Sequence, residues 1–121
     1  MSETVDSERS WYGVRTVFRV LNRPETIYEE RVTIWQAVSL EDAIAQAEND
    51  ALSYASPELG LYEYLGFAQA FKTYIPDRPP ESGDEVFSLL RDSKFKPSKY
   101  LDKFFDTGQE RERVIVEPAP R

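Results

Sequence analysis

The side chains best suited to chemistry near the N-terminus are tryptophans and arginines. Two segments, 11–21 and 27–37, alternate in polarity, and their less apolar face carries Trp11, Arg15, Arg19, Glu29, Arg31 and Trp35. Arginine grips carboxylates and phosphates through two parallel hydrogen bonds, and tryptophan offers a flat stacking face. Both types are enriched in the hot spots of protein interfaces. The sequence therefore predicts a binding surface of these six residues. The alternative is a solvated sheet face with cross-strand ion pairs.

Glu30 is the candidate for acid–base chemistry. It falls on the apolar parity of its segment, opposite Phe18 in the expected pairing, so it lies either at the wet end of the sheet or buried beside an arginine or tyrosine. A buried carboxylate in a pocket, with Arg15 or Arg31 as a clamp, would make a small enzyme. Glu29 points to the other face of the strand, so the two adjacent carboxylates cannot act on one substrate atom.

The absence of two residue types limits any chemistry further. The 121 residues include no cysteine and no histidine, which excludes thiol nucleophiles, disulfides, imidazole bases and the Ser-His-Asp triad. Proton transfer would therefore fall to a carboxylate or a tyrosine. We expect no cofactor and no metal. The absence of histidine and cysteine favours a binding function over a catalytic one.

The charge is strongly acidic and unevenly placed. The chain has 22 acidic and 15 basic residues, a net charge of −7, which argues against a nucleic-acid partner. Residues 1–60 hold 11 acids and 5 bases, whereas Arg91 to Lys103 holds five bases and two acids. That basic segment is either a charged helix start on the surface or a contact for an acidic surface on a partner. An example of such a surface is the set Glu41, Asp42, Glu48 and Asp50.

Two further clusters have a structural and a functional interpretation. A proline-rich loop contains acids that could bind calcium or magnesium, but their spacing matches no EF-hand, so a solvated loop is favoured: Asp77, Glu81, Asp84 and Glu85. An aromatic segment could line a ligand pocket, but residues of this kind at strand spacing are more often core: Tyr62, Tyr64, Phe67, Phe71 and Tyr74.

The first half of the chain predicts a hairpin and a helix. The two alternating segments are strands joined by a five-residue turn, 22–26, with Leu21 opposite Ile27 and Arg19 opposite Glu29. Ser39 is a helix N-cap with Asp42 three residues later. An apolar stripe rich in alanine follows, which lets the helix lie close to a sheet.

The second half predicts two strands and a helix. Residues 61–75 form one long strand, bent or bulged at Gly66. After a loop over 76–84, residues 85–91 suit a fourth strand, although Asp84 could instead cap a short helix. Pro97 begins a second helix that Gly108 closes. The fold class is therefore α+β, an antiparallel sheet of about four strands in the order β-β-α-β-β-α with helices on one face.

The domain organisation follows from these elements. Residues 11–108 form a single domain between a disordered tail, 1–10, and a mostly disordered tail, 109–121, in which Val114 to Val116 could add a weak edge strand. The N-terminus lacks the features of a signal peptide, and no apolar run is long enough to span a membrane. We expect a cytoplasmic protein without membrane contact.

Several short motifs resemble a small bacterial family known only as a domain of unknown function. They are WYGVR at 11–15, YEER at 28–31, SLEDA at 39–43, EVFSL at 85–89 and YLDKFFDTG at 100–108. The resemblance covers roughly residues 11–108. It implies a bacterial source and one domain, and it transfers no catalytic role to any residue.

The sequence thus favours a non-catalytic protein-interaction or small binding module of a bacterial cytoplasmic protein. The partner is another protein or a second copy. One version is an immunity- or antitoxin-like protein whose negative charge steers it to a basic toxin. The alternative is the small enzyme built on Glu30 and an arginine clamp.

Overall fold

The computed structural model describes residues 9–110, and the chain divides into two compact units, Met1–Ser88 and Leu89–Arg121. Most of the two predicted tails, residues 1–8 and 111–121, lies outside the described residues. No helix within residues 9–110 is long and apolar enough to cross a membrane.

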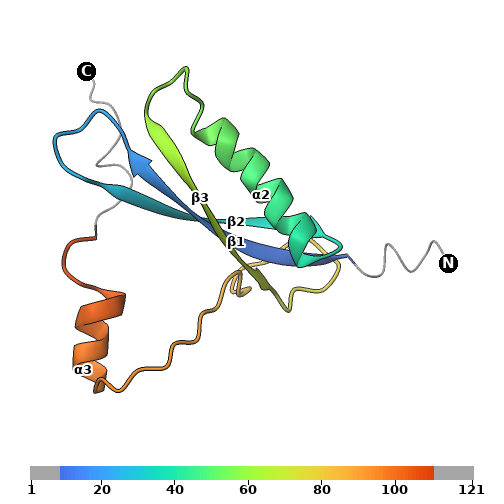
Figure 1. Cartoon of the computed structure of the whole chain (residues 1–121). Coiled ribbons are helices and arrows are strands. Elements are labelled where there is room, and N and C mark those ends of the chain that lie inside the picture. Colours follow the sequence, from blue (N-terminus) through green and yellow to red (C-terminus); the bar gives the residue numbers. More distant parts are fainter. Residues whose placement is uncertain (1–8, 111–121) are drawn as a thin grey trace. The chain divides into compact units, whose positions relative to one another are not determined.

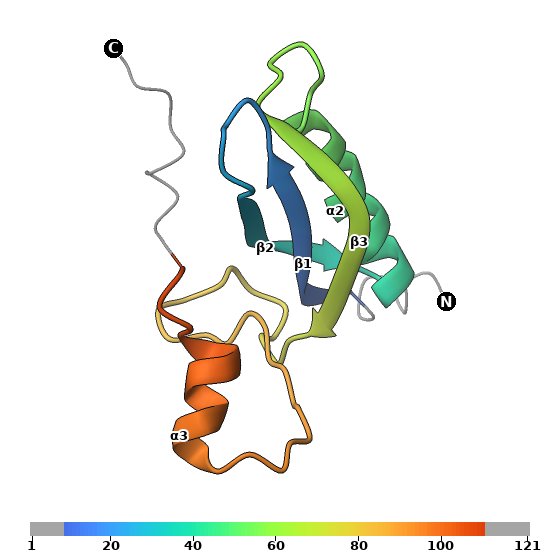
Figure 2. The same ribbon diagram turned by 60° about the vertical axis from the view of Figure 1, so that its left-hand side comes forward.

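The first unit is a sheet with one helix on it (Figure 1). Its elements are β1 (Ser10–Val20), β2 (Tyr28–Ala37), α2 (Leu40–Tyr54) and β3 (Tyr62–Lys72). The strands are antiparallel in the order β2-β1-β3. Helix α2 lies across one face of the sheet (Figure 2). The α+β class is confirmed, with three strands in the described chain rather than about four.

The predicted fourth strand at 85–91 is wrong: the segment is not a strand, and Val86 and Phe87 lie over a face of the sheet instead of extending an edge. The Val86 carbonyl lies directly over Gly13, where a Cβ would collide with it. Phe87 then packs beside Phe71, with ring centroids 6.1 Å apart. A chain lying above the sheet cannot join its in-plane hydrogen-bond ladder, and only glycine at position 13 admits so close an approach.

The core lies between the sheet and α2. Alternate side chains of β1 point toward the helix and are buried: Tyr12, Val14, Thr16, Phe18 and Val20. Opposite them, Ala43, Ala47 and Ala51 are at most 1% exposed. The predicted alanine stripe is confirmed, and its small side chains let α2 approach the sheet closely.

The start of α2 and the bulge in β3 follow the sequence prediction. The Asp42 N–H donates to Ser39 Oγ at 3.0 Å, and the Val38 N–H donates to Asp42 Oδ2 at 3.1 Å. Each side chain thus satisfies a main-chain donor at the helix start. In β3 the register to β1 shifts beside Gly66, whose φ of +84° is in the region that glycine favours.

Within residues 89–110, the second unit contains one short helical segment. It begins as α3 (Pro97–Tyr100) and continues as the π-helical turn η1 (Leu101–Phe105). Proline at the first helical position is confirmed, whereas the helix ends at Phe105, before the predicted Gly108. No residue of either element is buried.

Candidate functional site

The pairing of β1 with β2 differs by one residue from the sequence prediction. Arg19 lies opposite Tyr28, not Glu29. The Val20 N–H donates to the Ile27 carbonyl at 2.8 Å and closes the hairpin, so Leu21 does not pair with Ile27. The N–H of Leu21 instead donates to Leu61 at 2.8 Å. This long-range bond joins the end of β1 to the segment that precedes β3.

The changed register divides the predicted binding surface. A shift of one residue turns every side chain of a strand to the opposite face. The face opposite α2, here called the helix-free face, receives Trp11, Arg15 and Arg19. The face beneath α2 receives Glu29, Arg31 and Trp35. The six residues therefore do not form one surface.

The helix-free face carries a ladder of ion pairs across the three strands. Arg15 contacts Glu30 on β2 at 2.9 Å and Gln69 on β3 at 3.0 Å. Arg19 contacts Glu63 on β3 at 2.8 Å. Both arginines are therefore engaged by neighbours within the sheet. This arrangement matches the alternative interpretation, a solvated face held by cross-strand pairs.

Glu30 is not the buried acid that the enzyme hypothesis needs. It pairs with Val17 instead of Phe18, and its side chain is 57% exposed on the helix-free face. Exposure follows from the register, because the shift moves Glu30 away from the buried face of β1. Its carboxylate accepts a hydrogen bond from Arg15 Nε at 3.0 Å.

The two tryptophans are half-buried and are used within the protein. Trp11 donates its indole N–H to the Arg78 carbonyl at 2.7 Å, which attaches the proline-rich loop to β1. Trp35 donates to Thr33 Oγ1 at 2.8 Å and packs against the core beneath α2. Their indole N–H groups thus have partners inside the chain.

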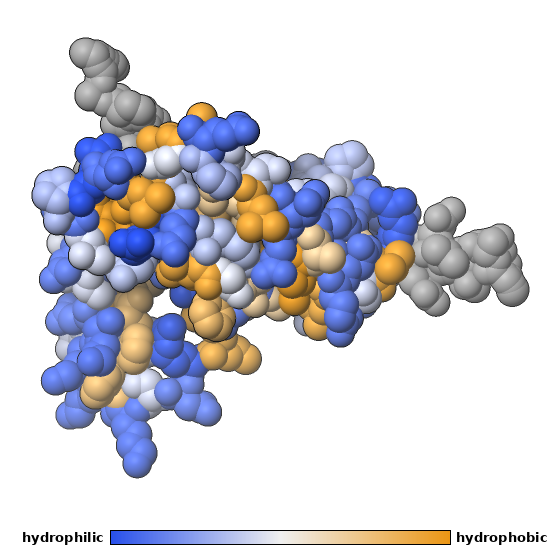
Figure 3. All heavy atoms as spheres, turned by 45° about the horizontal axis from the view of Figure 1, so that its top comes forward, coloured by the Kyte–Doolittle hydropathy of each residue, from blue (hydrophilic) through white to orange (hydrophobic). Residues whose placement is uncertain are grey.

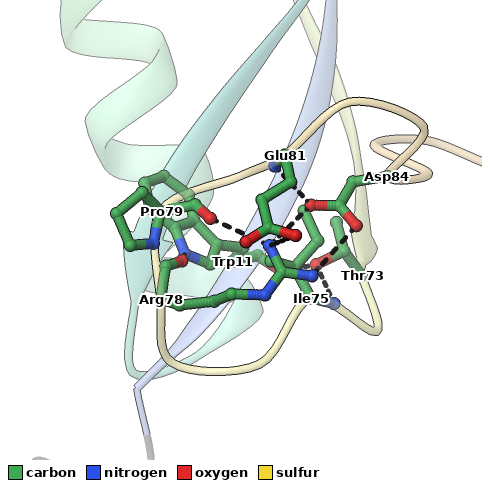
Figure 4. Close-up of polar contacts among 7 residues, drawn as sticks. All are labelled: Trp11, Thr73, Ile75, Arg78, Pro79, Glu81 and Asp84. Carbon is green, nitrogen blue, oxygen red and sulfur yellow. Dashed lines mark hydrogen bonds and ion pairs between the residues drawn. The ribbon is translucent and has the colours of Figure 1, made fainter.

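The proline-rich loop is held by one arginine (Figure 4). Arg78 donates to both carboxylate oxygens of Asp84, at 2.9 and 3.2 Å. The Glu81 N–H adds a third bond to Asp84, at 2.6 Å. The guanidinium of Arg78 and this amide hold the pKa of Asp84 below its usual value. The carboxylate of Asp84 is therefore bound by Arg78. Residues 9–110 contain no group of three or more acidic, histidine or cysteine side chains placed to hold a metal ion.

A polar and aromatic cluster beneath α2 was missed by the sequence analysis. The Tyr54 hydroxyl donates to Glu29 Oε1 at 2.6 Å, and the Arg31 guanidinium lies 3.8 Å from the centre of the Tyr54 ring. Arg31 also pairs with Asp50 at 3.6 Å. Two buried atoms of this cluster, Glu29 Oε2 and Arg31 Nη1, have no hydrogen-bond partner. The only local signal was Tyr54 at the end of the predicted helix stripe.

Two tyrosines in contact with α2 residues or at its end have raised pKa values. Burial, reinforced by the hydrogen bond to Glu29, raises the pKa of Tyr54 far above its usual value. Burial and Glu48 likewise raise the pKa of Tyr64, whose hydroxyl donates to Glu48 at 2.7 Å. Both phenols are therefore neutral hydrogen-bond donors at physiological pH, and neither can serve as a base.

The second unit presents apolar side chains to solvent. Six large ones are exposed within residues 89–110: Leu89, Leu90, Phe95, Leu101, Phe104 and Phe105. Apolar atoms lie among hydrophilic ones at the surface of this unit (Figure 3). Arg91 lies over the Phe104 ring at 4.3 Å, and Lys99 lies over Phe95 at 5.5 Å. The predicted basic segment is thus a mixed apolar and basic surface.

Comparisons with known proteins add no relative to this picture. No family model, no curated protein and no solved structure matches the chain.

Proposed function

We propose that this chain is a non-catalytic protein-interaction module and that its helical segment Pro97–Phe105 is a contact surface. The observation that carries the proposal is the exposure of that segment's apolar side chains. Phe105 is 75% exposed and Leu101 49% exposed. Exposed apolar side chains gathered with polar neighbours are typical of surfaces that bind another protein.

The length of the segment supports the same conclusion. Pro97–Phe105 spans nine residues. Isolated helices shorter than about 12 residues are marginal in water, and most helix stability in proteins comes from packing an apolar face. The unit itself buries none of this segment. A partner that covers the apolar face would supply the missing stabilisation.

The charges around the segment suggest the chemistry of the partner. Residues 91–103 contain five bases, of which Arg91 and Lys99 lie over the rings of Phe104 and Phe95: Arg91, Lys94, Lys96, Lys99 and Lys103. A short helix of this kind fits an apolar groove with an acidic rim.

The charge of the first unit is the reverse, with 16 acids and 7 bases. That surplus supports the immunity- or antitoxin-like version, in which the first unit meets a basic protein.

The enzyme alternative has less support. Its proposed acid, Glu30, is exposed and paired with Arg15. The raised pKa values of Tyr54 and Tyr64 keep both phenols protonated. The chain has no histidine or cysteine to take their place.

The proposal is tested by quantitative co-purification of the full chain from its native cells after mild cross-linking. The wild type is compared with the double variant Leu101→Ser/Phe105→Ser and with Asp102→Ser, an exposed position on the same helix. We expect the wild type and Asp102→Ser to retain the same protein and the double variant to lose it. Equal recovery by all three would remove Pro97–Phe105 as a contact surface. Urea unfolding of the first unit checks that the substitutions leave its stability unchanged.

A further inference from the structure

The outer edge of β2 is open for pairing. The order β2-β1-β3 leaves β2 and β3 as the two edge strands of the described sheet. An edge strand presents a row of unpaired N–H and C=O groups, and proteins commonly guard such edges with charges, prolines or bulges. The two edges of this sheet differ in these guards.

The hydrogen-bond pattern identifies which residues of β2 face outward. Val20 bonds to Ile27 across the hairpin, and residues alternate along an antiparallel pair. The odd-numbered residues of β2 therefore bond to β1, and the N–H and C=O groups of Glu30, Val32 and Ile34 point away from the sheet. The Gln46 side chain reaches the Gln36 carbonyl at 3.0 Å, which agrees with this alternation.

The charged side chains of β2 do not guard its edge. Glu30 turns inward to Arg15 on β1. Glu29 accepts from Tyr54, and Arg31 lies on the Tyr54 ring. Residues 28–37 also contain no proline and no lysine, and their register to β1 is unbroken. By contrast, β3 has a bulge beside Gly66, which makes it a poorer template.

From these observations we infer that β2 pairs antiparallel with β2 of a second copy of this chain, forming a continuous six-stranded sheet. The two-fold axis lies midway between Val32 and Val32 of the second copy, which are directly opposite each other. Glu30 then lies opposite Ile34, and Arg31 opposite Thr33. The pairing places open main-chain groups against their equivalents, as a two-fold interface requires.

Charge disfavours the registers whose dyad lies nearer the start of β2. A dyad at Arg31 would set two guanidinium groups directly opposite each other, and a dyad at Glu30 would oppose two carboxylates. The Val32 register opposes no like charges. It also sets Val32, which is 45% exposed, against Val32 of the second copy. The strand thus complements itself in main-chain bonds, charge and apolar surface.

This dimer uses a different surface from the helical segment Pro97–Phe105, so the two proposals can fail separately. Other occupants of the edge are a strand of an unrelated protein or the chain's own residues 114–116. Either would leave the chain without self-association through Val32. The test below separates them from a second copy.

The absence of cysteine allows a direct test with the full chain. In Val32→Cys the two new thiols would face each other across the two-fold axis. Hydrogen-bonded antiparallel residues have Cα atoms about 5.5 Å apart, and a disulfide can span that distance. We expect copper–phenanthroline to convert this variant to a covalent dimer. The matched control is Phe67→Cys on the other edge strand, where Phe67 is 73% exposed. Failure of Val32→Cys to cross-link, or equal cross-linking of Phe67→Cys, would overturn the inference.

Sedimentation equilibrium supplies an independent measurement. The wild type should be a dimer at micromolar concentration. Val32→Lys opposes two ammonium groups at the dyad and should weaken the dimer at least about tenfold. Val32→Pro removes only an outward N–H and should do the same while the strand stays paired to β1. Circular dichroism confirms folding of each variant. A wild type that stays monomeric, or a dimer that survives both substitutions, would contradict the inference.

Discussion

The Val86 carbonyl lies directly over Gly13, closer than any side chain at position 13 would permit. This approach brings the proline-rich loop back across the helix-free face. It lets Phe87 pack beside Phe71, above the sheet and outside its hydrogen-bond ladder. Because glycine has no Cβ, Val86 and Phe87 can cover part of that face.

Substitution of Gly13 should accordingly be costly. Gly13→Ala places a methyl group on the Val86 carbonyl, and we expect a loss of about 2 kcal/mol in the free energy of unfolding because overpacking forces the main chain to move. Urea unfolding measures the loss. Ala45→Ser, at an exposed position of α2, is the control and should change stability by less than about 0.5 kcal/mol. A wild-type midpoint for Gly13→Ala would contradict the close approach.

Arginines on the two faces of the sheet should contribute unequally. Arg19 is half exposed in an ion pair with Glu63, so Arg19→Ala should cost less than about 1 kcal/mol. Arg31 packs on Tyr54 and pairs with Asp50, and its loss should cost about 2 kcal/mol through lost packing and cation–π contact. The two variants are compared by chemical denaturation. Equal losses would show that Arg31 is not held as described.

The Arg78–Asp84 pair should make part of the stability dependent on acid pH. The pKa of Asp84 is lowered in the folded state, so its contribution is present above the unfolded pKa and is lost as the pH falls through the folded pKa. The melting-temperature difference between wild type and Asp84→Asn should thus be largest near neutral pH and shrink below about pH 4. A difference that does not change with pH would exclude this carboxylate as the source.

Tyr54 and Tyr64 should resist ionisation at high pH. Their pKa values are raised in the folded state, so the stabilisation they give is complete below the unfolded value of 10.0 and is lost as the pH rises above it. Absorbance titration at alkaline pH should show both phenols ionising only as the chain unfolds. Tyr54→Phe should remove one of these late-ionising phenols, and a titration curve that this substitution leaves unchanged would contradict the raised pKa of Tyr54.

Much of the fold could be predicted because it depends on neighbouring residues. Alternation placed the strands and the side chains of β1 that are buried. The Ser39 cap and the alanine stripe predicted α2, and Gly66 marked the bulge in β3. Pro97 marked the start of the second helix. Each signal acts within a few residues, where backbone preference and side-chain spacing are sufficient.

The candidate site depended on contacts that no local pattern contains. The hairpin register places Val20 opposite Ile27, and that register sends Arg15 and Arg31 to opposite faces. The joining of Glu29, Arg31 and Tyr54 beneath α2 needs the strand and the helix in place together. Alternation alone divides a strand into two faces without saying which face meets the helix. The sequence by itself therefore determined the elements and the limits on chemistry, whereas tertiary pairing decided which charged side chains meet.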